Sequence, residues 1–164
     1  MPSFIFIFDS SFAAPLSLHL QFVMENVITI LIVDDNRFMR ETLSFLISHE
    51  IEFELTGEAK SGEEAIRLNT LLTPDIILMD INMSPVNGFD TSRRILKERP
   101  STKIIGISVH REISYADQMI LLGGKGYITK SSPRQEIIHA IKEVYQNKNY
   151  ISEDVVIASD KIVS

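Results

Sequence analysis

The stretch that decides the fold is residues 28–33, ITILIV, which leads directly into two acids, Asp34 and Asp35. A continuous apolar run of this length is typical of a strand buried on both faces of a parallel sheet. Acids placed directly after such a run lie at the carboxyl end of the strand, where ligands of open α/β sheets bind. This stretch therefore predicts both the kind of sheet and the edge that carries its chemistry.

The unit of strand followed by helix recurs along the chain after residues 28–33. Further strands are predicted over 53–59, 75–79, 103–107 and 127–128. Helical spacing of apolar residues follows each strand, over about 39–47, 61–72, 88–99, 113–122 and 133–145. Right-handed crossovers between parallel strands place such helices on both faces of the sheet. We predict an α/β fold, a doubly wound (βα)₅ domain with a five-stranded parallel sheet.

Length and composition predict one domain with two dissimilar ends. The 164 residues suffice for a single core. Residues 1–23 are apolar and contain no Lys or Arg, and we interpret them as a start-site artefact or a disordered leader before Met24, with a membrane or partner tag as the alternative. The folded domain is predicted over 24–148, and the polar residues 149–164 are predicted to be a linker or tail.

Charge and cysteine usage exclude several classes of function. The net charge of −6 opposes binding of this chain to nucleic acid. The absence of cysteine excludes disulfide frameworks, thiol nucleophiles and Cys-ligated zinc, and it suits a reducing cytoplasm. No run is long enough for a membrane span.

Polar residues end the predicted strands and are expected to meet at one edge of the sheet. They are Asp34 and Asp35, Asp80, Ser108 and Lys130. Three adjacent carboxylates repel one another unless a cation neutralises them, and an all-oxygen donor set favours Mg²⁺. A lysine and a hydroxyl beside them can bind phosphoryl oxygens. The pattern predicts an aspartyl-phosphate acceptor site with Mg²⁺ as its cofactor.

These residues, in this order and at the ends of these strands, resemble the receiver domain of bacterial two-component response regulators. The resemblance covers about 26–148, and GGKGYITKSS with NKNYIS resembles receivers that precede a LuxR-type helix-turn-helix, the NarL/LuxR subfamily. It implies a flavodoxin-like, CheY-like fold and a cytoplasmic switch rather than an enzyme. It also implies a sensor histidine kinase or phosphotransfer protein as partner, homodimerisation as a further option, and control of transcription through a DNA-binding domain outside this chain.

The resemblance also implies roles for individual residues. Asp80 would be the phosphoacceptor, with Mg²⁺ held by Asp34, Asp35, Asp80 and the backbone carbonyl of Asn82. Ser108 and Lys130 would bind the phosphoryl group, and Tyr127 would turn inward when Ser108 moves. Val109 and His110 would line the rim, where the branched Val109 would restrict attacking water. The loop MDINMSPVNG departs from the family because Ser84 precedes Pro85, which shifts the proline by one place.

Each of these residues also has a purely structural interpretation. An Asp pair at a strand end can cap a helix, a lone lysine is usually solvated, Ser108 could be a turn residue, and Tyr127 could be core packing. A phosphatase and a nucleotide-binding domain are two other functions of similar folds. A Mg²⁺-dependent phosphatase with an aspartyl nucleophile would need an acid two residues after it, where this chain has Asn82. A nucleotide-binding flavodoxin-like domain would need a Gly-rich or hydroxyl-rich loop after the first strand, where the chain has VDDNRF.

Overall fold

The computed structural model describes residues 27–160, with side chains described up to residue 156. The leader predicted over 1–23 lies outside the described residues, as do 161–164. Six parallel strands form one sheet in the order β2-β1-β3-β4-β5-β6. The strands are β1 (Ile28–Val33), β2 (Phe53–Ala59), β3 (Ile76–Asp80), β4 (Lys103–Ser108), β5 (Gly126–Thr129) and β6 (Tyr150–Ile151). The helices are α2 (Arg37–Ser48), α3 (Gly62–Leu72), α4 (Gly88–Glu98), α5 (Ile113–Leu121), α6 (Arg134–Tyr145) and α7 (Glu153–Asp160).

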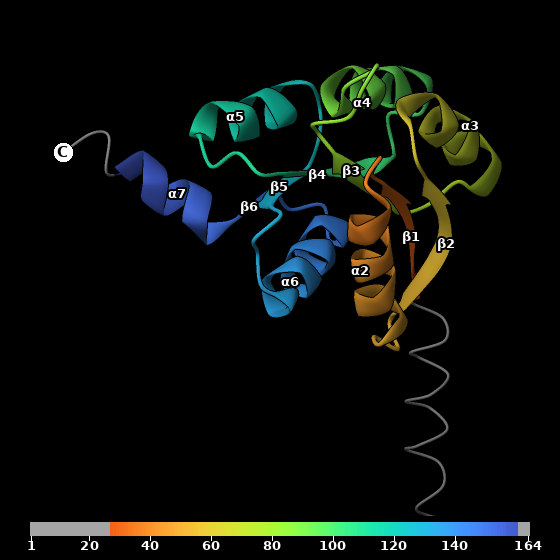
Figure 1. Cartoon of the computed structure of the whole chain (residues 1–164), viewed down its shortest axis with the longest axis horizontal. Helices are drawn as coiled ribbons and strands as arrows, with labels where there is room; N and C mark the ends of the chain where they lie inside the picture. Colours follow the sequence, from red (N-terminus) through yellow and green to blue (C-terminus); the bar gives the residue numbers. More distant parts are fainter. Residues whose placement is uncertain (1–26, 161–164) are drawn as a thin grey trace, which may run out of the picture.

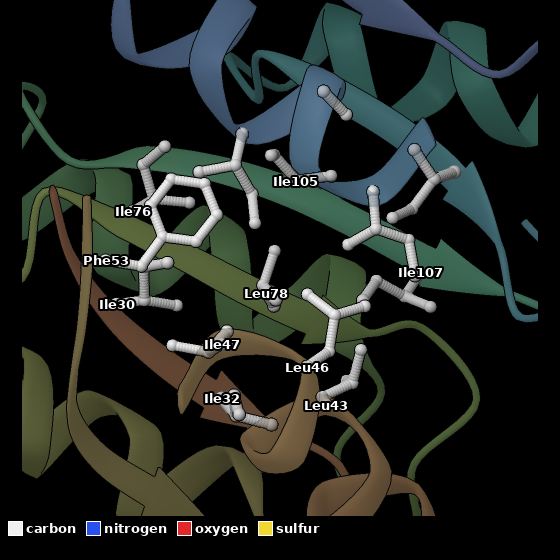
Figure 2. Close-up of a cluster of buried hydrophobic side chains, with 14 of the residues drawn as sticks. Ile30, Ile32, Leu43, Leu46, Ile47, Phe53, Ile76, Leu78, Ile105 and Ile107 are labelled. Carbon is white, nitrogen blue, oxygen red and sulfur yellow. The ribbon is translucent and has the colours of Figure 1, made fainter. Parts of the chain in front are cut away.

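Helices cover both faces of the sheet, as the doubly wound prediction requires. Helices α3, α4 and α5 lie on one side, and α2 and α6 lie on the other (Figure 1). Alternate residues of each strand therefore enter different cores, because successive side chains of a strand point to opposite faces. The core under α2 and α6 takes Ile30, Ile32 and Leu78 (Figure 2), and the opposite core takes Leu31 and Met79.

Short polar caps start the helices that flank the site. The Asn36 side chain accepts hydrogen bonds from the amides of Phe38 and Met39 at the start of α2. Because Asn36 is the N-cap, the preceding acids are not needed for that purpose. The Asn87 side chain likewise accepts from the Asp90 amide at the start of α4. Capping by asparagine leaves Asp34 and Asp35 available for other contacts.

The structure departs from the sequence prediction at the carboxyl end. The predicted linker from 149 instead contains a sixth strand and helix α7, so the sheet has six strands rather than five. The amide of Tyr150 donates to the Lys125 carbonyl at 3.0 Å, and that of Ser152 donates to the Tyr127 carbonyl at 2.9 Å. These bonds satisfy backbone groups at the edge of β5. A strand of two residues is too short to produce a recognisable hydrophobic period, which explains why the pattern missed it.

None of the helices within residues 27–160 combines the length and the apolar character that crossing a membrane requires.

Candidate functional site

The acidic residues meet where the strand order reverses. The chain passes from β1 outward to β2 and then returns to β3 on the other side of β1, which makes the β1/β3 edge the topological switch point. Asp34 and Asp35 follow β1, and Asp80 ends β3. One carboxylate oxygen from each of these three residues lies within 4.8 Å of the others. The structure thus brings together the three acids that the sequence placed at one edge.

Lys130 reaches into this cluster from the end of β5. Its Nζ lies 2.9 Å from Asp34 Oδ2 and 3.1 Å from Asp80 Oδ2, and its side chain is only 17% exposed. Burial by itself would lower the pKa of the ammonium, but the hydrogen bond to Asp34 and the charges of Asp80 and Asp34 outweigh it, so the pKa of Lys130 is raised. Lys130 is therefore a fixed positive charge in the site.

Asp80 occupies a costly environment for a negative charge. It is 2% exposed, and burial raises the pKa of its carboxyl. The backbone amide of Asn82, which donates to Asp80 Oδ1 at 3.1 Å, lowers this pKa, and so does Lys130. The negative charge of Asp34 raises it. The pKa of Asp80 is on balance above its usual value. One ammonium does not balance three carboxylates, so the site favours an additional cation.

The chemistry of these donors fits Mg²⁺. All three carboxylates are hard oxygen ligands, and no histidine or cysteine belongs to the cluster within the described part of the chain. Asp35 is exposed, while Asp34 and Asp80 are buried, so the cluster opens to solvent on the Asp35 side. Asn82 lies in the loop directly after Asp80 and is exposed.

Ser108 belongs to a chain of hydrogen bonds that starts at Asn82. Its hydroxyl donates to Asn82 Oδ1 at 2.8 Å and accepts from the His110 amide at 3.1 Å. The hydroxyl of Tyr127 donates to the His110 carbonyl at 2.9 Å. The sequence-based prediction gave Asn82 a role through its backbone carbonyl. The contact of its side-chain oxygen with the Ser108 hydroxyl was not predicted.

The expectation that Tyr127 turns inward when Ser108 moves stays a prediction. Its side chain is already fully buried, and burial raises its pKa to about 12. Because its hydroxyl holds the loop at His110, the ring has an inward position and a polar partner in the present arrangement.

The placement of Val109 and His110 at the rim of the site stays a prediction. Val109 is 65% exposed beside Ser108, and the His110 ring stacks on Tyr115 with centroids 4.3 Å apart. In the loop that departs from the family pattern, the amide of Ser84 donates to Asp35 Oδ2 at 3.4 Å. Ser84, the residue before the shifted proline, therefore brings a backbone donor to the acidic cluster.

Sequence reasoning missed Arg40. Its guanidinium donates to the Asp34 carbonyl at 2.8 Å and lies 3.4 Å from Glu58 Oε2 at the end of β2. This places a nearly buried cation under the acidic turn. Arg37, one helical turn earlier, is exposed and pairs within its own helix, so no sequence signal distinguishes the two arginines.

The chain is a flavodoxin-like α/β domain with an acidic cluster, a lysine and a hydroxyl at its switch point, and comparison with known proteins identifies the family. The family model for the response regulator receiver domain matches residues 30–142. The chain therefore belongs to the response regulator receiver domain family of two-component systems.

Relatives and solved structures agree with this assignment. The transcriptional regulatory protein DegU of Brevibacillus brevis is 37% identical over 133 residues, which cover 81% of this chain and 56% of DegU. The response regulator UvrY of Escherichia coli is 30% identical over 129 residues, which cover 79% of this chain and 59% of UvrY. A LuxR-family response regulator from an Aurantimonas species has a TM-score of 0.78 and 29% identity, and the match covers 83% of this chain and 99% of that one. The likeness to a LuxR-family structure agrees with the NarL/LuxR-type resemblance of the sequence.

The match to relatives is partial along their length. The chain spans 56% of DegU and 60% of the response regulator GacA of Pseudomonas aeruginosa. The response regulator domain of Thermotoga maritima CheB, by contrast, is covered over 97% of its chain, with a TM-score of 0.69 and 30% identity. The likeness therefore concerns the receiver domain.

Proposed function

We propose that this chain is a cytoplasmic phosphoacceptor switch in which Asp80 receives a phosphoryl group from a partner histidine kinase or phosphotransfer protein in the presence of Mg²⁺. The observation that carries the proposal is the buried Asp80 carboxylate, paired with Lys130 at 3.1 Å and with two further acids close by. A buried carboxylate held beside a lysine ammonium in this way is preorganised as a nucleophile.

The transfer step is a displacement at phosphorus. An oxygen of Asp80 attacks the phosphorus of a phosphohistidine, the new O–P bond forms, and the N–P bond breaks with its electron pair staying on the imidazole. Asp34, Asp35, Asp80 and the carbonyl of Asn82 would hold Mg²⁺, which supplies charge neutralisation for the phosphoryl oxygens when bound. Lys130 remains protonated and pairs with a phosphoryl oxygen.

Ser108 would transmit the new charge. A phosphoryl group adds about −1.5 to −2 charges and three acceptor oxygens. The Ser108 hydroxyl, which now donates to Asn82, would exchange that acceptor for a phosphoryl oxygen. Because the Tyr127 hydroxyl holds the carbonyl of His110, the displacement would be carried by the backbone of the loop after β4. The surface formed by α5, β5 and α6 would change accordingly.

The output is proposed from the relatives. DegU is described as a transcriptional regulatory protein, and it extends beyond the region that matches this chain. We propose control of transcription through a DNA-binding domain outside the 164 residues, because a net charge of −6 makes this chain itself a poor DNA ligand. Homodimerisation of the phosphorylated form is part of the same proposal.

Beryllofluoride titration in the presence and absence of Mg²⁺ tests the proposal against a phosphatase. A switch should bind beryllofluoride only with Mg²⁺ and should accept a single phosphoryl group from acetyl phosphate, with little release of inorganic phosphate. Sustained turnover of acetyl phosphate would favour the phosphatase, whose general acid would have to stand at Asn82. Binding of nucleotide without Mg²⁺ would contradict both.

A further inference from the structure

We infer that Asp154 of α7 is a positioning residue that joins the two loops carrying Ser108 and Lys130, so that docking of α7 depends on the state of the acidic site. The inference rests on the proposed phosphoacceptor function. It assigns a role to the segment 150–156, which the sequence analysis treated as a linker.

Three contacts of one carboxylate oxygen carry the inference. Asp154 Oδ2 accepts from Thr129 Oγ1 at 2.8 Å and from Ser131 Oγ at 3.5 Å, and it lies 3.2 Å from Arg111 Nε. Arg111 also donates to Ser131 Oγ at 3.0 Å, which closes the group. Asp154 therefore links the β4–α5 loop to the β5–α6 loop.

The two linked loops are the ones that hold the proposed phosphoryl ligands. Thr129 is buried and directly precedes Lys130, while Arg111 comes three residues after Ser108. A movement of Lys130 toward a phosphoryl group displaces Thr129, and a movement of Ser108 displaces the loop that carries Arg111. The distances from Asp154 to Thr129 and Arg111 can thus be satisfied together in only some arrangements of the loops.

Helix α7 is also packed against the switch strand itself. Val155 is fully buried in the same core as Tyr127, Ala116 and Met119. The amide of Ser152 donates to the Tyr127 carbonyl at 2.9 Å. A movement of β5 or of its flanking loops therefore displaces the start of α7.

A second anchor keeps the segment attached when the first is lost. Glu136 Oε1 on α6 accepts from the Tyr150 hydroxyl at 3.3 Å and from the Glu153 amide at 2.9 Å. These contacts do not involve either switch loop. Asp154 can therefore be altered without detaching the whole segment.

The direction of the coupling follows from the present contacts. Ser108 now donates to Asn82, and Lys130 pairs with Asp34 and Asp80, so the Asp154 contacts match the arrangement without a phosphoryl group. A ligand that draws Ser108 and Lys130 inward loosens α7. By linkage, a looser α7 makes that ligand bind more tightly.

The test measures amide exchange of residues 150–156 in the full chain, with Mg²⁺ and with or without beryllofluoride. Exchange in this segment should rise when beryllofluoride binds. Asp154→Asn should abolish most of that difference and bind beryllofluoride at least about fivefold more tightly, which is the lower end of usual coupling between sites. Glu153→Gln removes a charge from the neighbouring exposed position and should behave as the wild type.

The outcomes separate this inference from the proposed function. If the wild type does not bind beryllofluoride with Mg²⁺, the phosphoacceptor function itself fails. If it binds, but α7 exchange is unchanged and Asp154→Asn has wild-type affinity, the coupling is wrong and the function stands. A merely structural Asp154 would raise α7 exchange in the variant while leaving the affinity for beryllofluoride unchanged, and that result would also overturn the inference.

Discussion

At the scale of single residues, the balance of charge around Asp80 governs what the site can do. Three carboxylates face one ammonium, and burial already raises the pKa of Asp80. The energetic cost falls when a cation enters or when a carboxylate is removed. Ligand binding and stability are thus expected to respond in opposite directions to loss of an acid.

Asp35→Ala tests this opposition, because Asp35 is the exposed member of the cluster. The variant should bind Mg²⁺ about tenfold or more weakly, since one of the charged metal ligands is lost. Its melting temperature should be unchanged or raised, because repulsion with Asp34 and Asp80 is relieved. Calorimetric Mg²⁺ titration and thermal unfolding measure the two effects, with Asp117→Ala on α5 as an exposed control. A marked fall in melting temperature would point to a structural cap instead.

Ser108→Ala separates phosphorylation from its transmission. The variant keeps Lys130 and the three acids, Asp80 among them, so it should still accept a phosphoryl group from acetyl phosphate. It lacks the hydroxyl that changes partner from Asn82, so most of the phosphorylation-dependent change in amide exchange over residues 109–130 should disappear. An exchange difference equal to that of the wild type would rule out Ser108 as the coupling element.

The site residues were predictable from sequence because parallel strands end at one edge. Asp34, Asp80 and Lys130 needed only correct strand ends to be placed together, and Lys130 Nζ lies 2.9 Å from Asp34 Oδ2 and 3.1 Å from Asp80 Oδ2. The Asn82 amide and Arg40 were not predictable, since their contacts depend on side-chain directions within a loop and a helix. The roles of all these residues remain predictions that the experiments above test.

At the scale of elements, the start of α4 packs closely against the end of β3, which carries Asp80. A Cβ on Gly88 would lie well inside 3.0 Å of backbone atoms of Asp80 and Ile81. The Gly88 amide also donates to the Ile81 carbonyl at 3.0 Å. Backbone cannot move aside as a side chain can, so this contact fixes the loop that follows Asp80.

Gly88→Ala should therefore lower the free energy of unfolding by roughly 1–3 kcal/mol, the usual range for overpacking. It should also slow phosphorylation, because the loop bearing Asn82 must shift. Gly57→Ala is the matched control, since its added Cβ would come closer than 3.0 Å only to the flexible end of the Leu72 side chain, and no backbone atom is among its near neighbours. Denaturant unfolding of both variants measures the difference, and equal stabilities would contradict the close packing described for α4.

The elements show where sequence patterns lose information. The five longer strands were predicted within one or two residues. Ile76–Asp80 is recognisable as a buried apolar run, whereas Phe53–Ala59 was recognised by its alternating character. Strand β6 and helix α7 were missed because two residues carry no period and Val155 is the single fully buried hydrophobic among residues 150–156. Such a segment is fixed by its tertiary contacts with β5 and α6 rather than by its own pattern.

At the scale of the whole molecule, residues 27–160 form a six-stranded sheet with a hydrophobic core on each face. Strand β1 is central, lies between β2 and β3, and begins at Ile28. The apolar residues 1–23 lie outside the described residues, and each predicted site residue lies after them in the chain. The receiver is therefore expected to work without them.

Deletion of residues 1–23 should leave acetyl phosphate labelling and the melting temperature unchanged, because each side chain of the site lies at or after Asp34. Labelling and thermal unfolding of the shortened chain are compared with those of the full chain. Insolubility of the shortened chain, or a large loss of stability, would mean that the leader covers part of the domain surface.

The central claim is that Asp80 is the residue that receives the phosphoryl group, with Mg²⁺ required. The most direct measurement is borohydride reduction of the acetyl phosphate-treated chain followed by peptide mass spectrometry, which marks the modified aspartate. We predict a mark at Asp80 alone, and no mark when Mg²⁺ is left out. Asp80→Asn should fold normally and carry no mark. The control variant Asp117→Asn should be marked at Asp80 like the wild type. A mark on another carboxylate, or labelling of Asp80 that is independent of Mg²⁺, would contradict the account.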